Sequence, residues 1–236
     1  FVLIENVLGI KNIAGEIVND LDSIGYHSDY KAFQASDYGV PQNRTRVFFF
    51  GNEKSSNSLS NIKDFFNYLE KISGSESHFV LKEALHGLRS LKTHPKKNDT
   101  KNEIALSGYN IEDLSEYNPN SYLEKINFGK VPRHTYNHKA RYNNERDVEI
   151  FRRLPQGGDS MHESIRDIMP YKRRDKIFKD KYYKLVDNKP CKAITSHMKF
   201  DCNMYIHPRE SRGLTPREAA RVQSFSDDFF FVGPIS

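Results

Sequence analysis

The alternation of strand-like and helix-like segments over residues 1–52 constrains the fold more than any other feature of the sequence. The apolar run FVLI leads directly into Glu5, as a buried strand leads into its loop. Apolar residues recur at helical spacing over 12–24, and Gly25 follows as a helix-ending glycine. A strand over 27–35, the turn YGVPQN and a strand RVFFFG complete the segment. This order predicts an α/β fold, the later half of a doubly wound (Rossmann-like) sheet.

The rest of the chain divides into two further parts. After the polar stretch SSNSLSN, a helix is expected over 62–72, which closes a first domain at 1–75. Residues 76–208 are basic, tyrosine-rich and irregular, with a helix expected over 145–154, and they predict a small loop- and strand-rich domain. Residues 209–236 are expected to form a helix through which the chain returns toward the first domain. Because the chain begins inside a strand, it is expected to be a fragment of a longer protein.

The composition excludes several classes of protein. The chain has 236 residues, a net charge of +5 and 37% apolar residues, which favours a globular protein with an anionic partner. Its two cysteines, Cys191 and Cys202, are too few for a disulfide framework or a four-ligand zinc site, so no metal site is predicted. No apolar run is long enough to span a membrane. A cytoplasmic location is therefore expected.

The last helix carries a clear start signal. In RGLTPREAARVQSF, Thr215 can accept from the amide of Glu218, and the Glu218 side chain can reach back to the amide of Thr215. Pro216 occupies the first helical position, where its missing N–H is harmless. The helix is predicted to begin after Thr215 and to bury Ala219, Ala220, Val222 and Phe225.

Three residues of the first domain are candidates for chemistry. Arg44 and Arg46 lie two apart at the start of a strand, so both should point to one face of the sheet and bind carboxylates or phosphates. An ion-paired strand edge is an equal alternative for them. Glu5 follows a strand and could hold a proton in a pocket, although an ion-pair or turn role is the more common one for such a residue.

Taken together, the segments resemble the DNA cytosine-5 methyltransferases. FVLIENV resembles the family's Glu-Asn-Val motif, YGVPQNRTRVFFFG its Gln-x-Arg-x-Arg motif, and RGLTPREAARVQSFSDDFFFVG the helix after its target-recognition domain. The segment NKPCKAITSHMKFDCNMYIHPRESR resembles the approach to that helix. Residues 81–190 carry little family signature, as expected for a target-recognition domain.

The resemblance implies a mechanism and assigns roles. In this family a cysteine thiolate adds to C6 of a flipped-out cytosine, and C5 then takes a methyl group from S-adenosylmethionine. A glutamate hydrogen-bonded at N3 stabilises the charge that builds on the ring, and by the match this residue is Glu5. Arg44 and Arg46 are expected to line the active site and to orient the carboxylate. Asn6 is expected to hold the loop geometry.

The departures from the family pattern limit what this chain can do alone. The glycine-rich cofactor loop and the Pro-Cys nucleophile motif both precede the Glu-Asn-Val segment in the family and are absent here. Pro190-Cys191 lies far downstream without the flanking residues of that motif, so Cys191 is expected to be a small packed residue. No cofactor-binding residue is assigned, and the chain alone is expected to be inactive. A missing N-terminal catalytic half, on the same chain or a separate subunit, is an expected partner.

The middle domain carries an electrostatic signal of its own. Between Lys130 and Lys184 there are fifteen Lys and Arg against eight Asp and Glu, which suits the phosphates of double-stranded DNA. A solvated basic face is the alternative for any single residue. The first cluster predicted to contact DNA is Arg133, His134, Lys139 and Arg141, and the second is Lys172, Arg173 and Arg174. Thr195 aligns with a recognition-domain threonine of the resembled family and joins them.

The final helix is expected to act structurally. The residues predicted to brace the recognition domain are Arg212, Arg217, Arg221 and Gln223. The preferred reading is a fragment of a bacterial or phage-like, nucleoid-associated DNA methyltransferase, with or without a cognate restriction enzyme. The alternatives are a non-catalytic DNA-binding specificity module, a subunit of a split methyltransferase, and an RNA cytosine-5 methyltransferase.

Overall fold

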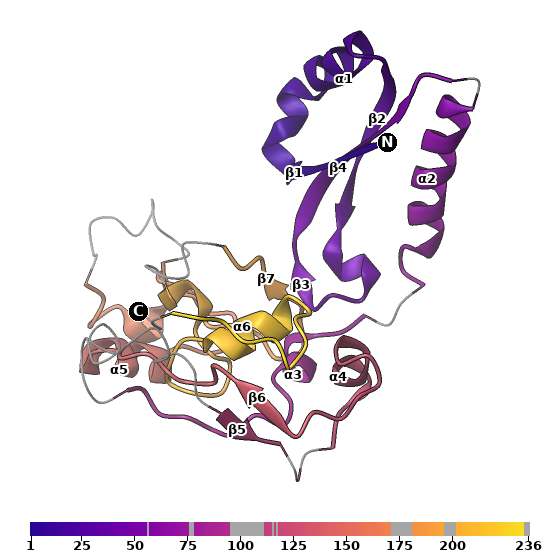
Figure 1. The fold of residues 1–236 in the computed structure, drawn as a ribbon. Coiled ribbons are helices and arrows are strands. Elements are labelled where there is room, and N and C mark those ends of the chain that lie inside the picture. Colours follow the sequence, from indigo (N-terminus) through magenta and orange to yellow (C-terminus); the bar gives the residue numbers. More distant parts are fainter. Residues whose placement is uncertain are drawn as a thin grey trace. The chain divides into compact units, whose positions relative to one another are not determined.

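The computed structural model describes most of the chain as two compact units. The described ranges are 1–55, 57–75, 78–94, 111–114, 116, 118–170, 181–195 and 202–233. The first unit spans Phe1–His78 and the second Phe79–Ser236 (Figure 1). The second of the two clusters predicted to contact DNA, Lys172, Arg173 and Arg174, lies outside the described residues.

A three-stranded sheet forms the centre of the first unit. Its strands are β1 (Val2–Val7), β2 (Tyr26–Gln34) and β4 (Thr45–Glu53), in the order β1-β4-β2. The central strand β4 runs antiparallel to both neighbours, so β1 and β2 run in the same direction. The short elements η2 (Ala35–Tyr38) and β3 (Gln42–Asn43) lie between β2 and β4 in the chain. The predicted mixed α/β architecture is confirmed.

Two helices pack on opposite faces of this sheet (Figure 1). A 3-10 turn, η1 (Leu8–Ile13), leads into α1 (Ala14–Ser23), which packs on the face that carries Val47 and Phe49. Helix α2 (Ser58–Ile72) packs on the other face, where the ring of its Phe65 stacks on Phe50. The two faces alternate along β4 because successive side chains of a strand point to opposite sides.

Local signals located the elements of this unit well, but not their burial. The helix predicted over 12–24 is present as α1, and Gly25 follows it with a φ of 95°. The first strand was predicted to be buried, but in this structure it is half-buried at Val2, Ile4 and Asn6, while Phe1 is 87% and Leu3 51% exposed. The reason is positional: β1 has β4 on one side only within the described sheet.

The second unit contains short elements joined by long loops. They are α3 (Leu81–Ala84), β5 (Ile111–Asp113), α4 (Ser121–Ile126), β6 (His134–Tyr136), α5 (Glu145–Arg153), η3 (Glu163–Ile165), β7 (Cys191–Lys192), η5 (Cys202–Tyr205) and α6 (Pro216–Val222). Strands β5 and β6 pair antiparallel. One hydrophobic cluster joins α3, α4 and α6, and a second surrounds α5, so regular structure is anchored where side chains are buried.

The last helix begins as the sequence predicts. The hydroxyl of Thr215 accepts from the Glu218 amide at 3.1 Å, and the Glu218 carboxylate accepts from the Thr215 amide at 2.7 Å. Helix α6 is buried on all sides, including its arginines. Phe225 departs from the prediction, because it lies beyond the end of the helix and is 36% exposed.

Candidate functional site

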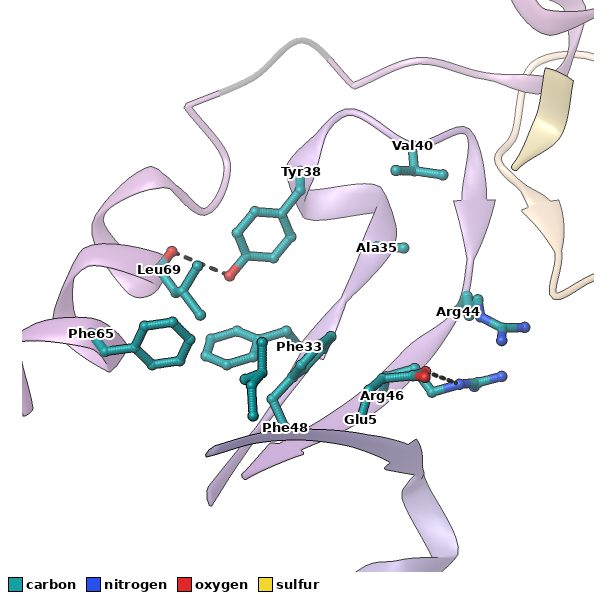
Figure 2. A pocket seen from close by; sticks show the side chains of 11 residues that line it. Glu5, Phe33, Ala35, Tyr38, Val40, Arg44, Arg46, Phe48, Phe65 and Leu69 are labelled. Carbon is teal, nitrogen blue, oxygen red and sulfur yellow. Dashed lines mark hydrogen bonds and ion pairs between the residues drawn. The ribbon is translucent and has the colours of Figure 1, made fainter. Parts of the chain in front are cut away.

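A cavity of about 480 Å³ opens on one face of the sheet in the first unit (Figure 2). One end is charged, and the remainder is a wall of aromatic and aliphatic side chains. The lining residues are Leu3, Glu5, Phe33, Ala35, Tyr38, Val40, Arg44, Arg46, Phe48, Phe65 and Leu69. The three candidates for chemistry in this unit, Glu5, Arg44 and Arg46, therefore meet in one cavity.

The register of the sheet places Glu5 beside Arg46. Glu5 on β1 lies opposite Phe48 on β4. Arg46 is two residues from Phe48 along β4, so it is the diagonal neighbour of Glu5 on the same face of the sheet. Arg46 Nε lies 2.9 Å from Glu5 Oε1. Arg46 Nη1 donates to the carbonyl of Thr45 at 2.8 Å, which fixes the guanidinium plane. The Glu5 side chain is 49% exposed and that of Arg46 is 19% exposed, so the pair stands at the cavity mouth with the carboxylate open to a ligand.

Arg44 adds a second positive charge to this end of the cavity. Its pKa is lowered, first because burial disfavours the charged guanidinium and then because Arg46 is close, while Glu5 opposes the shift. Figure 2 shows the guanidiniums of Arg44 and Arg46 extending to the same side, beyond the Glu5 carboxylate. Two guanidiniums and one carboxylate sum to a net positive charge, which suits a ligand with an anionic group.

Polar residues that the sequence analysis did not identify support this end of the sheet. Gln34 and Thr45 face one another in the register of β2 and β4, and the Thr45 hydroxyl donates to the Gln34 side chain. Tyr38 donates its hydroxyl to the carbonyl of Leu69 at 3.2 Å, which ties η2 to α2 across the cavity (Figure 2). Asn6, which the sequence analysis did identify, lies within β1 rather than in a loop, and its side chain accepts from the Val7 amide at 2.8 Å.

Cys191 is a core residue, as expected. It is 2% exposed and lies in the hydrophobic cluster of α3, α4 and α6. Burial raises the pKa of its thiol to about 12, so almost no thiolate is present near neutral pH. This cysteine cannot serve as a nucleophile from that position.

The first cluster predicted to contact DNA divides into two kinds of residue. Arg133 and His134, at the start of β6, are exposed. Lys139 and Arg141 are half-buried, because the segment before them, residues 135–138, enters the core. His138 of that segment is completely buried. The exposed pair is therefore better placed to reach a phosphate than the half-buried pair.

Thr195 is exposed and its backbone is held by a buried ring. Its amide donates to the hydroxyl of Tyr205 at 3.2 Å, and its own hydroxyl lies 3.2 Å from the same oxygen. Tyr205 itself is fully buried. The sequence analysis identified Thr195 but not Tyr205, the tyrosine whose hydroxyl accepts from its amide.

Arg221 and Arg217 hold together segments of the second unit. Arg221 is fully buried and binds Asp227 through Nε at 2.7 Å and Nη2 at 3.0 Å. Arg217, also fully buried, donates to the carbonyls of Tyr136, Ser226 and Phe229. Burial lowers the pKa of Arg217 to about 10, which still leaves it charged near neutral pH.

Arg212 forms a second buried cluster. Its guanidinium binds Glu218 with two hydrogen bonds of 2.7 Å and Glu210 with one of 2.7 Å. These contacts hold the pKa of Glu218 at about 2 against the opposing effect of burial. Gln223 differs from the three arginines, because it is exposed and donates to the carbonyl of Ala219 in its own helix.

The described residues contain no group of His, Cys, Asp or Glu side chains arranged to hold a metal ion. Among the same residues, no helix combines the length and the apolar character needed to cross a bilayer.

Comparison with known proteins adds family information to this geometry. The family model described as C-5 cytosine-specific DNA methylase matches residues 1–236. The type II methyltransferase M.DdeI of Desulfomicrobium norvegicum is 30% identical over 247 residues, which cover 99% of this chain and 54% of that protein. The type II methyltransferase M.Bpa9945I of Bacillus paralicheniformis is 28% identical and is matched over 98% of this chain and 53% of its own length. The chain thus spans just over half the length of these relatives.

A solved structure shows the same fold. It is described as a DNA modification methyltransferase encoded within a prophage of E. coli, and it superposes with a TM-score of 0.65 at 22% sequence identity. The match covers 99% of this chain and 61% of that one. The arrangement of elements described above therefore recurs in a solved protein.

Proposed function

This chain belongs to the C-5 cytosine-specific DNA methylase family, and from that premise we propose that it forms the carboxyl-terminal part of an enzyme that methylates DNA. The reaction is transfer of a methyl group from S-adenosylmethionine to C5 of cytosine at a specific duplex site. The single observation that supports this best is the Glu5 carboxylate held by Arg46 at 2.9 Å in a cavity that also contains Arg44.

Glu5 acts on the ring of the target cytosine. Its Oε1 contacts Arg46, so its other oxygen is the one assigned to N3 of the base. A proton shared between that oxygen and N3 stabilises the negative charge that develops when a nucleophile adds at C6. A fixed carboxyl contributes more than a mobile one, because no reorganisation is needed as the charge appears.

Arg46 and Arg44 have different tasks. Arg46 is tied both to Glu5 and to the carbonyl of Thr45, which makes it the residue that orients the carboxyl. Arg44 is destabilised in its charged form by burial and by Arg46, and a phosphate of the flipped nucleotide would relieve that repulsion. We assign Arg44 to the nucleotide and Arg46 to Glu5.

The described residues do not fit a complete site for S-adenosylmethionine. The charged end of the cavity carries two guanidiniums, which repel the positive sulfonium, and its one carboxylate is already paired with Arg46. We propose that a further N-terminal half, on the same chain or a separate subunit, supplies both the cofactor loop and the nucleophilic cysteine.

The second unit is proposed to recognise the DNA. Arg133 and His134 are the exposed members of the first cluster, and Thr195 is exposed on a segment held by Tyr205. Lys139, Arg141, Lys172, Arg173 and Arg174 remain proposed contacts from sequence. Arg212, Arg217 and Arg221 are proposed to keep this unit rigid. The relatives named above are type II methyltransferases, which supports a bacterial or phage restriction-modification setting and gives no support to an RNA substrate.

The test is methyl transfer from labelled S-adenosylmethionine to duplex DNA. The protein from the full reading frame is compared with residues 1–236 alone, each with and without Glu5→Gln. We expect activity in the full protein only, lowered about 100-fold or more by Glu5→Gln, as for loss of one oxyanion-stabilising group. A full protein that binds DNA but transfers no methyl group would instead establish the non-catalytic specificity module. Activity of residues 1–236 alone would overturn the proposed incompleteness of this chain.

A further inference from the structure

Strand β2 has an open edge along its whole length. Within the described sheet it pairs with β4 alone, in one continuous antiparallel register. It is nine residues long and contains no proline, and its register is not interrupted by a bulge. Proteins shorten, kink or cover edges of this kind, because an open edge is a template for pairing with another strand. The edge of β2 is therefore a candidate interaction surface.

Two hydrogen bonds show which backbone groups of β2 are directed toward β4. The Ala35 amide donates to the Arg44 carbonyl at 2.9 Å, and the Lys54 amide donates to the Gly25 carbonyl at 2.9 Å. Both pairs continue the register of β2 and β4. In an antiparallel ladder the hydrogen-bonded pairs recur at every second residue, so the odd-numbered residues of β2 direct their backbone groups to β4.

The even-numbered residues consequently direct their N–H and C=O groups to the open edge. Tyr30 agrees with this pattern, because its amide donates to the carboxylate of its neighbour Asp29, at 2.7 Å, rather than to β4. Ser28 and Ala32 flank Tyr30 at the same spacing. A second strand laid against this edge would meet a regular row of backbone donors and acceptors.

The charges on β2 favour a second copy of the same strand as the partner. Antiparallel pairing of two β2 strands about a twofold axis at Tyr30 places Asp29 of each copy directly opposite Lys31 of the other. Opposite charges across a strand pair are stabilising, and these two fall at sites without backbone hydrogen bonds, where side chains are closest. Both lie on the face that α2 covers, since Lys31 Nζ lies 2.7 Å from Glu70 of that helix.

A cavity of about 360 Å³ beside this edge leaves room for side chains of an added strand. Leu59, at the start of α2, lines the cavity and is 65% exposed, so a second copy would cover an apolar side chain there. The lining residues are Ser28, Asp29 and Lys31 of β2 with Leu59, Ile62, Lys63, Phe66 and Asn67 of α2.

We infer that two copies of this protein associate through their β2 strands and form one continuous sheet, in the order β1-β4-β2-β2-β4-β1. The Tyr30 amide of each copy then donates to the Tyr30 carbonyl of the other. Asp29, released from that amide, pairs with Lys31 across the axis. The inference goes beyond the proposed function and does not rest on it. Neither Asp29 nor Lys31 lines the cavity that contains Glu5, so turnover at that site does not depend on the pairing.

The experiment is sedimentation velocity of the full-length protein without DNA, at concentrations from about 1 to about 100 µM. The wild type is expected to pass from monomer to dimer across this range. The charge variants are Asp29→Lys, Lys31→Asp and the double exchange Asp29→Lys/Lys31→Asp. Asp20→Lys is the matched control, because Asp20 is exposed on α1, on the opposite face of the sheet from α2. Circular dichroism and urea unfolding check that each variant keeps its fold.

The pairing predicts a different result for each charge variant. Either single reversal should raise the dissociation constant about tenfold or more, because symmetry turns two attractive pairs into two repulsive ones. An equal mixture of the Asp29→Lys and Lys31→Asp proteins should form a heterodimer, because every charge on one strand then faces its opposite. The double exchange should dimerise like the wild type, and Asp20→Lys should leave the dissociation constant unchanged.

Ala32→Pro tests the backbone bonds separately from the charges. Proline removes an N–H that points away from β4 and keeps the Cβ, so the strand can retain its pairing with β4. The variant should lose the dimer at every concentration. Ala32→Ser, which keeps the N–H, is its control and should dimerise like the wild type.

A wild type that stays monomeric at every concentration overturns the inference. A dimer that the single charge reversals leave unchanged, or a mixture that forms no heterodimer, also overturns it, because the interface then lies elsewhere. A monomer whose Ser28 and Ala32 amides resist hydrogen exchange would place another segment of the protein on this edge. A protein that dimerises as expected but methylates nothing would overturn the proposed enzyme alone, and one that methylates DNA as a monomer would overturn the dimer alone.

Discussion

Arg221 and Asp227 form an ion pair from which solvent is excluded, since both side chains are 0% exposed and two hydrogen bonds of 2.7 and 3.0 Å join them. Asn127 donates to the same carboxylate at 3.0 Å, and Arg221 also donates to the carbonyl of His86. The pair thus connects the end of α6, the end of α4 and the loop after α3. Removing one partner leaves a buried charge without the group that pairs with it.

Arg221→Met is therefore expected to destabilise the second unit by about 3–5 kcal/mol, because Asp227 stays buried without its partner. Arg152→Met is the matched control, since Arg152 is 66% exposed and its bond to Glu149 lies in water. That substitution should cost less than about 1 kcal/mol. Urea unfolding followed by circular dichroism measures both, and equal losses would contradict the role given to Arg221.

Thr215→Ala should cost about 1–2 kcal/mol of unfolding free energy, because the Glu218 amide and the ring of His138 both lose the Thr215 hydroxyl. Thr215→Ser keeps the oxygen and should stay within about 0.5 kcal/mol of the wild type. The same urea titration distinguishes the two. A large loss in the serine variant would show that the methyl group, and not the cap, is what matters.

Stability should depend on pH through the buried His207. Burial lowers the pKa of His207 to about 4, while neighbouring Glu218 and Glu210 oppose the shift, and Arg212 and Arg209 add to it. The unfolded chain therefore binds a proton near pH 6.5 that the folded chain does not bind until about pH 4. The free energy of unfolding is expected to fall by about 1.4 kcal/mol per pH unit as pH decreases through that window.

His207→Asn tests that assignment. The Asn oxygen can replace Nδ1 as acceptor for the amides of Arg209 and Glu210, but it cannot take up a proton. Urea midpoints measured from pH 7 to pH 4 should show a shallower decline for this variant. His138, whose pKa burial also lowers, contributes to the decline that remains, as do carboxylates such as Glu218 whose pKa is lowered. A variant as steep as the wild type would exclude His207 as the source.

Phe128 holds a left-handed backbone conformation at the end of α4, with a φ of 55°, and its ring is 85% exposed. Asparagine tolerates this conformation better than phenylalanine, so Phe128→Asn should raise stability by about 0.5–1 kcal/mol. Val131→Asn, at an exposed position close by whose φ is not positive, should bring no gain. Thermal unfolding of the two variants decides the matter, and a loss on Phe128→Asn would mean that the ring makes a stabilising contact.

In the full-length enzyme, Arg46→Lys should lower the turnover number for methyl transfer about 100-fold with little change in DNA affinity, because the carboxyl of Glu5 loses its fixed orientation. Lys31→Gln is the control, since Lys31 pairs with Glu70 outside the cavity. Single-turnover rates and binding constants separate the two effects. A variant that weakens binding and leaves the rate unchanged would reassign Arg46 to the DNA.

The sequence by itself determined most elements of the first unit, two helices of the second, and the family. Helix starts and stops depend on residues within about four positions of the helix end. The capping box of Thr215 and Glu218 and the helix-ending Gly25 could therefore be recognised in the sequence. Glu5, Arg44 and Arg46 stand in short motifs whose spacing is visible in one chain. Cys191 could likewise be assigned to the core, because the residues that flank it do not form a nucleophile motif.

Only the tertiary structure decided which of these residues meet. Glu5 contacts Arg46 because β1 and β4 pair in one register, and a shift of one residue would have turned Arg46 to the other face. Arg221 contacts Asp227, and Tyr205 contacts Thr195, because loops pack together whose sequences have no hydrophobic periodicity. The exposure of β1 and of Phe225 could likewise not be predicted from the sequence, because burial depends on neighbours that are distant in the chain. Local propensity places an element, whereas contacts between distant residues require the folded chain.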